Sequence, residues 1–355
     1  MMTLLSFVFV LGVLIFFHEL GHFLVAKWAG VRVDKFSLGF PPNIFTRKWG
    51  DTIYCIGAIP LGGYVKMLGE NPDEESTGSP DEYMSKPVWK RFLIILAGPF
   101  MNYLLAVAIL VGIVFFVGQP LFDSDRVLVG EIVAGHPADM AGIKVDDQII
   151  AVNGEMLASF DSLRARINAQ VGVPIEVIWL NDGDTITATM TTAIAEQPNI
   201  KGGVDSVGVI GFGQKVIGHN RYGLMASLAS GFATTNRIGI ETVKFVKRTV
   251  TGEVSAKLIG GPLFIAQQSG REAQKGASNL FFFMALLSVN LCILNILPIP
   301  VLDGGQLVFL AVEKLKGKPL SMKVRMAIQQ VGVVFLLLLI VMVTYNDVMR
   351  FFTSY

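Results

Sequence analysis

The sequence predicts a polytopic α-helical membrane protein with about four transmembrane helices, a membrane-associated β-hairpin region and one inserted α+β domain. The chain of 355 residues is 52% hydrophobic and only 16% charged, whereas an average soluble domain is roughly 25% charged. Four apolar stretches reach, or nearly reach, the roughly 20 helical residues that cross a bilayer core of about 30 Å. Between the second and third stretches, residues 119–278 are of mixed polarity and leave room for a soluble domain.

The first apolar stretch, residues 4–26 within a segment of 1–30, is expected to be a retained transmembrane helix. A cleaved signal peptide carries a basic region ahead of a shorter apolar run. Residues 1–17 contain no basic side chain, and the apolar run continues to Val25. This pattern favours a span over a cleaved segment.

Lysine and arginine residues set the predicted orientation, because basic residues near the ends of spans stay on the cytoplasmic side. They are frequent between the first two spans and again between the last two. Both connecting loops are therefore expected in the cytoplasm. Residues 119–278 and both chain ends are expected on the extracytoplasmic face.

The first cytoplasmic region, residues 31–87, is predicted to form β-hairpins. Short β-type runs at 36–42, 52–56 and 60–66 are bounded by glycine and proline, which is typical of strands joined by turns. Residues 71–81, rich in Glu, Asp, Ser, Gly and Pro, are expected to form a mobile surface loop.

The second apolar stretch, residues 92–117 within a segment of 88–118, contains Gly98-Pro99. This pair favours a kink that lets helices pack closely. Asn102 is expected to face the helix bundle and form hydrogen bonds there.

Residues 125–192 are predicted to form the inserted α+β domain. The order is a strand, a short helix ended by Gly142, a strand running into an Asn-Gly hairpin turn, a second helix and a further strand. This order resembles a PDZ domain. Asp146 stands where a glycine is usual, which is tolerable because Asp also visits left-handed conformations.

Residues 193–278 are expected to form an extracytoplasmic linker. Within it, residues 222–258 have the pattern of an amphipathic helix on the membrane surface, and residues 260–266 indicate a turn back to the bilayer. The third apolar stretch, 280–312 within 279–315, is interrupted by Pro298 and Pro300 and is expected to restart after Gly304-Gly305. The fourth, 331–345 within 326–347, is short.

The motif His18-Glu-Leu-Gly-His22 lies in the first span. Helical spacing puts both histidines on one face, where neutral imidazoles bind zinc, and Glu19 is placed to take a proton from a water that the metal activates. A carboxylate inside a span costs roughly 2.5 to 3.5 kcal/mol, so Glu19 needs a partner or a water-filled cavity. The alternative is that these side chains merely satisfy one another between helices.

A catalytic zinc site has three protein ligands and one open position. His136 and His219 belong to the extracytoplasmic segment, whereas the charge rule puts His18 and His22 in the cytoplasmic half of their span. Asp303 is the only acidic residue of the third apolar stretch, and irregular backbone at this depth lines a cavity or is buried by protein. Asp303 is therefore the predicted third ligand, the alternative being an Asp that caps the following helix.

These motifs resemble the site-two protease family, and especially the bacterial regulator-of-sigma-E proteases. The shared features are His-Glu-Leu-Gly-His in the first span, Gly98-Pro-Phe-Met-Asn102 in the second, one PDZ-like insert, and Asn295-Ile-Leu-Pro-Ile-Pro-Val-Leu-Asp-Gly-Gly305 in the third. The resemblance implies an intramembrane zinc metalloprotease with Zn²⁺ as cofactor and Asp303 as the third ligand. It also implies that Asn295 and Asn290 hold the substrate, and that a hairpin at about 33–66 dips into the membrane.

For partners, the resemblance implies single-span membrane proteins already trimmed by an upstream extracytoplasmic protease, such as anti-sigma factors or signal-peptide remnants. The place would be the lipid bilayer of a bacterial cytoplasmic (inner) membrane. No nucleic acid is expected, because the net charge of +1 comes without a basic patch. Many of these relatives carry two tandem PDZ domains, whereas this chain has room for one.

Two other functions fit parts of the sequence. A membrane scaffold built around the PDZ-like domain would carry a degraded metal triad, and a metal-ion transporter would distribute intramembrane His and Asp along a path. A complete set of residues at one point favours the protease. The two cysteines, Cys55 and Cys292, lie far apart and are expected to be unpaired.

Overall fold

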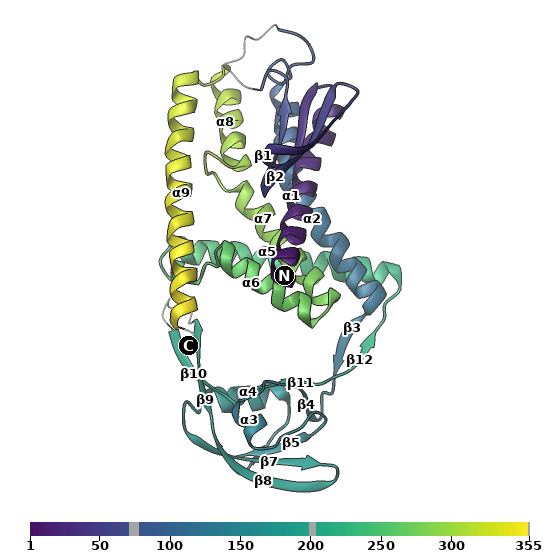
Figure 1. The fold of residues 1–355 in the computed structure, drawn as a ribbon, viewed down its shortest axis with the longest axis vertical. Coiled ribbons are helices and arrows are strands. Elements are labelled where there is room, and N and C mark those ends of the chain that lie inside the picture. Colours follow the sequence, from purple (N-terminus) through teal and green to yellow (C-terminus); the bar gives the residue numbers. More distant parts are fainter. Residues whose placement is uncertain (71–77, 199–203, 354–355) are drawn as a thin grey trace. The chain divides into compact units, whose positions relative to one another are not determined.

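The computed structural model describes residues 1–70, 78–198 and 204–353, which form two compact units (Figure 1). Unit 1 comprises Met1–Ile113, Leu224–Val246 and Ile259–Tyr355, and unit 2 comprises Val114–Gly223 and Lys247–Leu258. Most of the loop expected at 71–81 lies outside the described residues. The two segments of unit 2 therefore lie between the three segments of unit 1 along the chain.

Four helices in the described part of the chain are long and apolar enough to cross a membrane, as predicted. They are α1 (Met2–Trp28), α2 (Val88–Gly112, continued by a π-helical turn at Ile113–Val117), α7 (Ala277–Ile296) and α9 (Met322–Thr353). Helix α9 is longer than the predicted 326–347, because the helix continues beyond its apolar centre at both ends.

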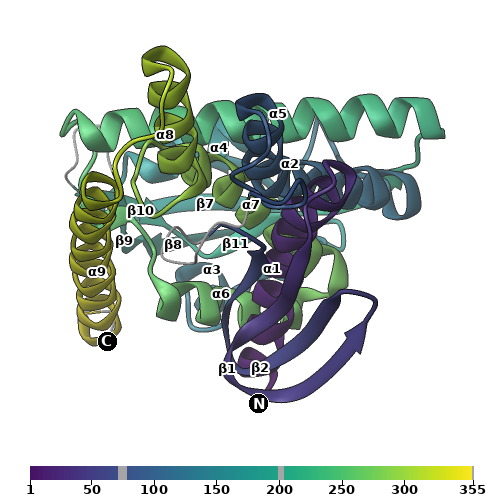
Figure 2. The same cartoon turned by 90° about the horizontal axis from the view of Figure 1, so that it is seen from above.

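Helices α1, α2 and α7 pack into a bundle through apolar side chains such as Val10, Leu14, Leu105 and Met284. At the crossing of α1 and α2, a Cβ atom on Gly21 would overlap the backbone carbonyl of Ala97. The two backbones therefore approach as closely as glycine permits. Viewed from above, α9 stands apart from α1 and α2 (Figure 2).

The third apolar stretch breaks where the prolines predict, but the restart differs from the prediction. Helix α7 ends at Ile296, and α8 (Asp303–Lys316) begins at Asp303 rather than after the two glycines. Gly304 and Gly305 lie in the first turn of α8, where Cβ atoms would overlap the carbonyl groups of the preceding loop. The glycines permit this tight fold-back and do not interrupt the helix.

Two further helices of the linker region run across the direction of α1 and α9 (Figure 1). They are α5 (Leu224–Val250) and α6 (Pro262–Lys275), and a short 3₁₀ turn, Ala256–Leu258, lies between them. No side chain of α6 caps its own N-terminus. The buried carboxylate of Asp347 on α9 accepts hydrogen bonds there from the backbone of Gly261 and Phe264, each at 3.0 Å. This contact joins α9 to α6.

The predicted hairpin region forms two long, bent strands, β1 (Val33–Trp49) and β2 (Thr52–Met67). Residues 35–38 of β1 pair on one side with residues 53–56 and on the other with residues 63–66 of β2. The pairing therefore builds a small sheet from one hairpin. Residues 63–67 form one edge of this sheet, since no other strand pairs with them in the described part of the chain.

Unit 2 contains an α+β domain around a sheet of six strands in the order β11-β4-β5-β7-β8, with β6 paired to β5. Helices α3 and α4 pack with the sheet around buried residues such as Trp179. Asp146 has a φ of +82°, as its place in a left-handed turn requires, and Asn153-Gly154 forms the predicted hairpin turn. The elements are β4 (Val127–Ile132), α3 (Pro137–Met140), β5 (Gln148–Val152), β6 (Glu155–Met156), α4 (Phe160–Asn168), β7 (Pro174–Asn181), β8 (Asp184–Thr191) and β11 (Phe212–Gln214).

Two pairs of strands complete unit 2. Strand β9 (Ala193–Pro198) pairs with β10 (Val204–Val209), and β3 (Gln119–Phe122) pairs with β12 (Val216–Asn220). Because β11 adds to the sheet beside β4, the domain uses residues beyond the predicted range of 125–192. Elsewhere, Cys55 and Cys292 are both buried and free, which confirms the prediction that they are unpaired.

Candidate metal centre

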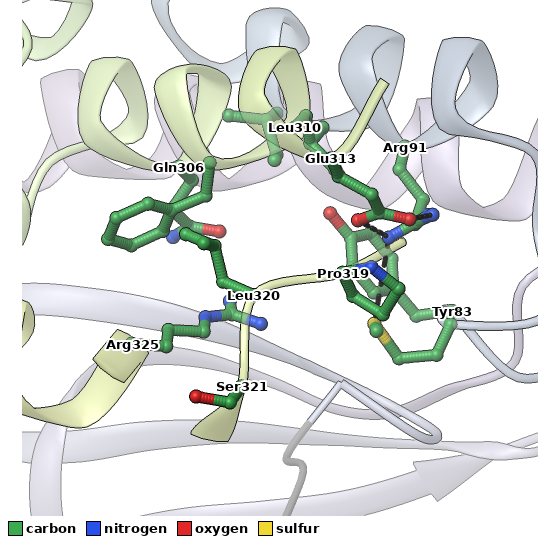
Figure 3. A pocket seen from close by; sticks show the side chains of 12 residues that line it. Tyr83, Arg91, Gln306, Leu310, Glu313, Pro319, Leu320, Ser321 and Arg325 are labelled. Carbon is green, nitrogen blue, oxygen red and sulfur yellow. Dashed lines mark hydrogen bonds and ion pairs between the residues drawn. The ribbon is translucent and has the colours of Figure 1, made fainter. Parts of the chain in front are cut away.

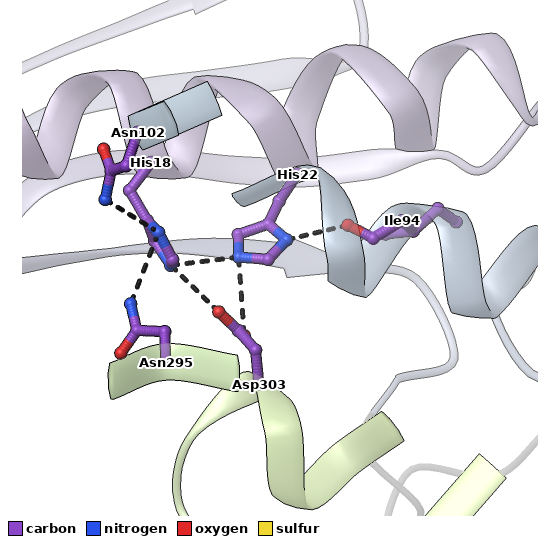
Figure 4. Close-up of polar contacts among 6 residues, drawn as sticks. All are labelled: His18, His22, Ile94, Asn102, Asn295 and Asp303. Atoms are coloured by element: carbon purple, nitrogen blue, oxygen red, sulfur yellow. Dashed lines mark hydrogen bonds and ion pairs between the residues drawn. The ribbon is translucent and has the colours of Figure 1, made fainter. Parts of the chain in front are cut away.

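Three side chains from two distant parts of the sequence meet inside unit 1. His18 and His22 extend from α1 toward Asp303 at the start of α8 (Figure 4). The two Nε2 atoms lie 3.2 Å apart, and carboxylate oxygens of Asp303 lie 3.2 Å from that of His18 and 3.5 Å from that of His22. Each of the three side chains is less than 15% exposed. Among the described residues, this is the one group of three or more His, Cys, Asp or Glu residues spaced to hold a metal.

The donor set and its spacing fit zinc. Two imidazole nitrogens and a carboxylate oxygen are usual ligands of a catalytic zinc ion, and a tetrahedron with bonds of about 2.0 to 2.1 Å has edges of about 3.3 Å. The observed separations of 3.2 to 3.5 Å agree with such edges. Three protein ligands leave a fourth position open for water or substrate.

Helix α2 fixes the ring of His22 from behind. The Nδ1 hydrogen of His22 is donated to the carbonyl oxygen of Ile94 at 2.8 Å, which leaves Nε2 as the nitrogen that faces Asp303. Gly98 lies against the same ring, and a Cβ atom there would overlap His22 Nε2. The sequence pattern indicated close helix packing at Gly98, but only the crossing of α1 and α2 reveals that this packing makes room for the centre.

Asp303 does not act as the N-cap of α8. The N-cap position belongs to Leu302, and no side chain caps the helix. Asp303 is the first residue of the helix, where a negative charge is favourable, and its carboxylate faces the two histidines. The geometry thus favours a metal ligand over the capping alternative.

Glu19 lies beside the centre and borders the β-hairpin. A Cβ atom on Gly63, in the edge segment of β2, would come within 3.0 Å of Glu19 Cγ and 2.9 Å of the Ile15 side chain. The edge of the small sheet therefore passes directly over the predicted general base.

A second carboxylate, Glu70, follows β2, and burial raises its pKa. No sequence pattern singles out Glu70, because its burial depends on the folded hairpin.

The structure separates the asparagines that the sequence grouped together. Asn295, at the end of α7, has its amide nitrogen 3.5 Å from His18 Nδ1, and Asn102 of α2 approaches the same atom at 3.4 Å. Asn290 accepts a hydrogen bond from Thr242 of α5 at 2.7 Å instead. His136 and His219 both belong to unit 2 and are not part of the cluster.

A buried ion pair joins α2 to the C-terminal part of α8. Arg91 donates two hydrogen bonds to Glu313, at 2.6 and 3.0 Å, and the two side chains are 6% and 15% exposed. A cavity of about 300 Å³ lies next to this pair, with Tyr83 and Arg325 among its lining residues (Figure 3). In the sequence, Arg91 is only one of several basic residues between the first two spans.

Comparison with known proteins agrees with the geometry. The family model described as Peptidase family M50 matches residues 6–339. The regulator of sigma-W protease RasP of Bacillus subtilis is 30% identical over 99% of this chain and 99% of its own length. The zinc metalloprotease RasP of Bacillus licheniformis is 29% identical over 99% and 100%, respectively.

A further relative in Rhizobium meliloti, whose name places it among the zinc metalloproteases, is 33% identical over 98% of this chain and 96% of its own length. These matches confirm the resemblance seen in the sequence motifs. The chain therefore belongs to Peptidase family M50 and is an intramembrane zinc metalloprotease.

Proposed function

We propose that this protease cleaves the transmembrane segments of single-span membrane proteins at a centre formed by His18, His22 and Asp303. The observation that carries the proposal is the meeting of these three donor groups, all within 4.8 Å of one another, between helices long enough to span a membrane. One compact centre is the arrangement of a hydrolase, whereas a transporter needs a series of polar residues along a path.

Zn²⁺ supplies Lewis acid chemistry when bound, activating a water molecule and polarising the substrate carbonyl group. Glu19 takes the proton of the attacking water as general base and then passes it to the leaving amine. Ile94 holds the ring of His22 in place through its Nδ1 hydrogen. No covalent intermediate with the protein is needed.

We further propose that the unwound substrate binds between the edge of the β-hairpin and the end of α7. A transmembrane helix hides its carbonyl groups in its own hydrogen bonds, so it must open locally before attack. Residues 63–67 form an edge strand of the small sheet next to Glu19 and suit the addition of a substrate strand. Asn295, with Asn290 one and a half turns earlier on α7, is proposed to bind the freed substrate backbone.

The proposed substrates are proteins trimmed beforehand by an extracytoplasmic protease, such as anti-sigma factors or signal-peptide remnants. The name of the Bacillus subtilis relative refers to the regulation of sigma-W, which supports the first of these classes. We place the enzyme in the bacterial inner membrane, with the metal centre toward the cytoplasm and unit 2 and both chain ends on the other side, because basic residues gather in the two proposed cytoplasmic loops. The α+β domain of unit 2, read as PDZ-like from its order of elements, is proposed to control access.

Replacing Glu19 tests the mechanism. In the Glu19→Gln variant, we expect full zinc content but a fall in cleavage of a model transmembrane peptide by on the order of 10² to 10⁴, the usual contribution of general acid–base catalysis. Zinc content and peptide turnover of the full-length protein in detergent would be measured together. Glu241→Gln, at a carboxylate that is 64% exposed on α5, is the matched control and should change neither. Turnover of Glu19→Gln within a few-fold of the unmodified enzyme would exclude the proposed role.

A further inference from the structure

We infer that Asn102 is a positioning residue for the metal centre. Its amide oxygen accepts the Nδ1 hydrogen of His18 and thereby sets the tautomer of His18 that presents Nε2 to zinc. This inference rests on the proposed function only in taking His18 as a metal ligand.

Asn102 is held firmly where this role requires it. It lies on α2 one turn after Gly98, its side chain is 1% exposed, and its amide lies 3.4 Å from His18 Nδ1 (Figure 4). The hydroxyl group of Ser288 on α7 donates a hydrogen bond of 2.7 Å to the backbone carbonyl of Asn102. This bond ties the backbone of Asn102 to a second helix of the bundle.

The protonation pattern of a metal-bound imidazole determines which end of the amide must face His18. When Nε2 is the ligand of a neutral imidazole, Nδ1 carries the hydrogen and needs an acceptor. An amide nitrogen facing that position would set one donor against another. The acceptor must therefore be an amide oxygen.

The amide oxygen of Asn102 needs a donor of its own. With the amide nitrogen turned toward His18, Oδ1 is buried and has no hydrogen-bond partner among the described residues. A buried acceptor without a donor costs free energy, and such atoms are rare in folded proteins. Half a turn of the amide about its last side-chain bond exchanges its two ends and brings the oxygen to the Nδ1 hydrogen of His18.

Asn295 is a less suitable partner for His18. Its amide lies 3.5 Å from the same Nδ1 atom, but that atom carries a single hydrogen, so one amide suffices. Asn295 is only partly buried and stands at the end of α7, beside the break that leads to Asp303. Its amide is therefore available to bind substrate, whereas Asn102 orients the proposed metal ligand His18.

Helix α2 then orients both histidines in the same way. The carbonyl oxygen of Ile94 accepts from Nδ1 of His22, and in the inferred orientation of the amide the oxygen of Asn102 accepts from Nδ1 of His18, the atom that the amide nitrogen now approaches at 3.4 Å. Partners of this kind behind zinc-binding histidines typically change metal affinity or activity by about 10- to 100-fold when removed.

The test is the zinc affinity of the full-length protein in detergent, measured by competition with a chelator of known affinity. We expect Asn102→Leu to raise the Kd for zinc by about 10- to 100-fold. Asn102→Ala should raise the Kd for zinc by a similar factor, and it replaces Asn102→Leu as the test if leucine disturbs the packing. Asn102→Asp should stay within about threefold of the unmodified protein, because a carboxylate still accepts the hydrogen bond.

Asn295→Leu provides the matched comparison, because the same change is made at the other amide near His18. We expect it to leave the zinc Kd within about threefold of the unmodified protein, below the 10-fold minimum for a lost partner, while lowering cleavage of a transmembrane peptide. Zinc binding within threefold in both Asn102→Leu and Asn102→Ala would overturn the inference. An equal rise of the zinc Kd in Asn295→Leu and in Asn102→Leu would also overturn the inference. If the unmodified protein binds zinc but cuts no transmembrane peptide, the proposed function fails and the zinc comparison still decides the role of Asn102.

Discussion

At the scale of single residues, Asp303 joins the two halves of the proposed centre, because the histidines come from α1 and the carboxylate from α8. Asparagine has nearly the same shape as aspartate and is an equally good N-cap. Asp303→Asn therefore separates a ligand role from a helix-capping role. We expect its zinc affinity to fall by at least about tenfold, because a neutral oxygen replaces a carboxylate. Chelator competition on the purified variant measures this, and unchanged zinc affinity would exclude Asp303 as a ligand.

The residues that act locally could be read from the sequence, and those that act across helices could not. His18, Glu19 and His22 follow from the spacing on one helix, and Asp303 stands out as a lone acid in an apolar stretch. The contacts of Asn102 with His18 and of Ile94 with His22 depend on which turn of α2 crosses α1. No pattern along the chain contains that information.

At the scale of elements, the crossing of α1 and α2 gives a prediction for Gly98. The Gly98→Ala variant should lose zinc binding, because its Cβ atom would overlap His22 Nε2 and the backbone of α2 cannot retreat without separating the helices. Gly112→Ala is the matched control, since it lies in the same helix with no atom within 4 Å of an added Cβ. It should bind zinc normally. Normal zinc binding by Gly98→Ala would mean that the crossing is looser than described.

The Arg91–Glu313 pair gives a second prediction at this scale. Removing one partner of a buried ion pair leaves an uncompensated charge and typically costs about 3 to 5 kcal/mol. We expect Arg91→Met to lose that much unfolding free energy in a titration with denaturing detergent, and Arg91→Met with Glu313→Leu to regain most of it.

The exposed pair of Lys244 and Glu241 provides the control for that comparison. Their side chains are 54% and 64% exposed, so Lys244→Met should change stability by less than about 1 kcal/mol. Equal effects at the two sites would show that burial does not distinguish them.

The elements also show where the sequence pattern was insufficient. Pro298 and Pro300 predict the break in the third apolar stretch, because proline disrupts a helix. The restart at Asp303 was missed, since glycine is usually read as a helix breaker. Here Gly304 and Gly305 are needed for close contact with the preceding loop. Strand β11 was missed for a similar reason, because its partner β4 lies some 80 residues earlier in the chain.

At the scale of the whole molecule, the strand pair of β3 and β12 shows where unit 2 can be shortened. Phe122 and Val216 are paired neighbours at its end, so residues 123–215 can be replaced by an Asn-Gly turn, which suits a two-residue hairpin. We expect this variant to bind zinc and to cleave a short, pre-trimmed substrate as before. It should also cleave untrimmed full-length proteins that the complete enzyme rejects, because the proposed access control is gone.

The comparison of two substrates in one membrane preparation decides between access control and catalysis. A variant that inserts and binds zinc but cannot cut the short substrate would show that unit 2 takes part in the reaction itself. A variant that still rejects untrimmed proteins would place selection elsewhere in the molecule.

The insertion of unit 2 between α2 and α7 has a consequence during synthesis on the ribosome. Translation completes α1 and α2 early, so both histidines and the general base are present while Asp303 has yet to be made. A growing chain therefore holds two of its three proposed ligands until the whole of unit 2 has been translated. The last ligand arrives only after the domain proposed to select substrates is complete. The order of segments along the chain therefore places the assembly of the proposed metal centre after the synthesis of unit 2.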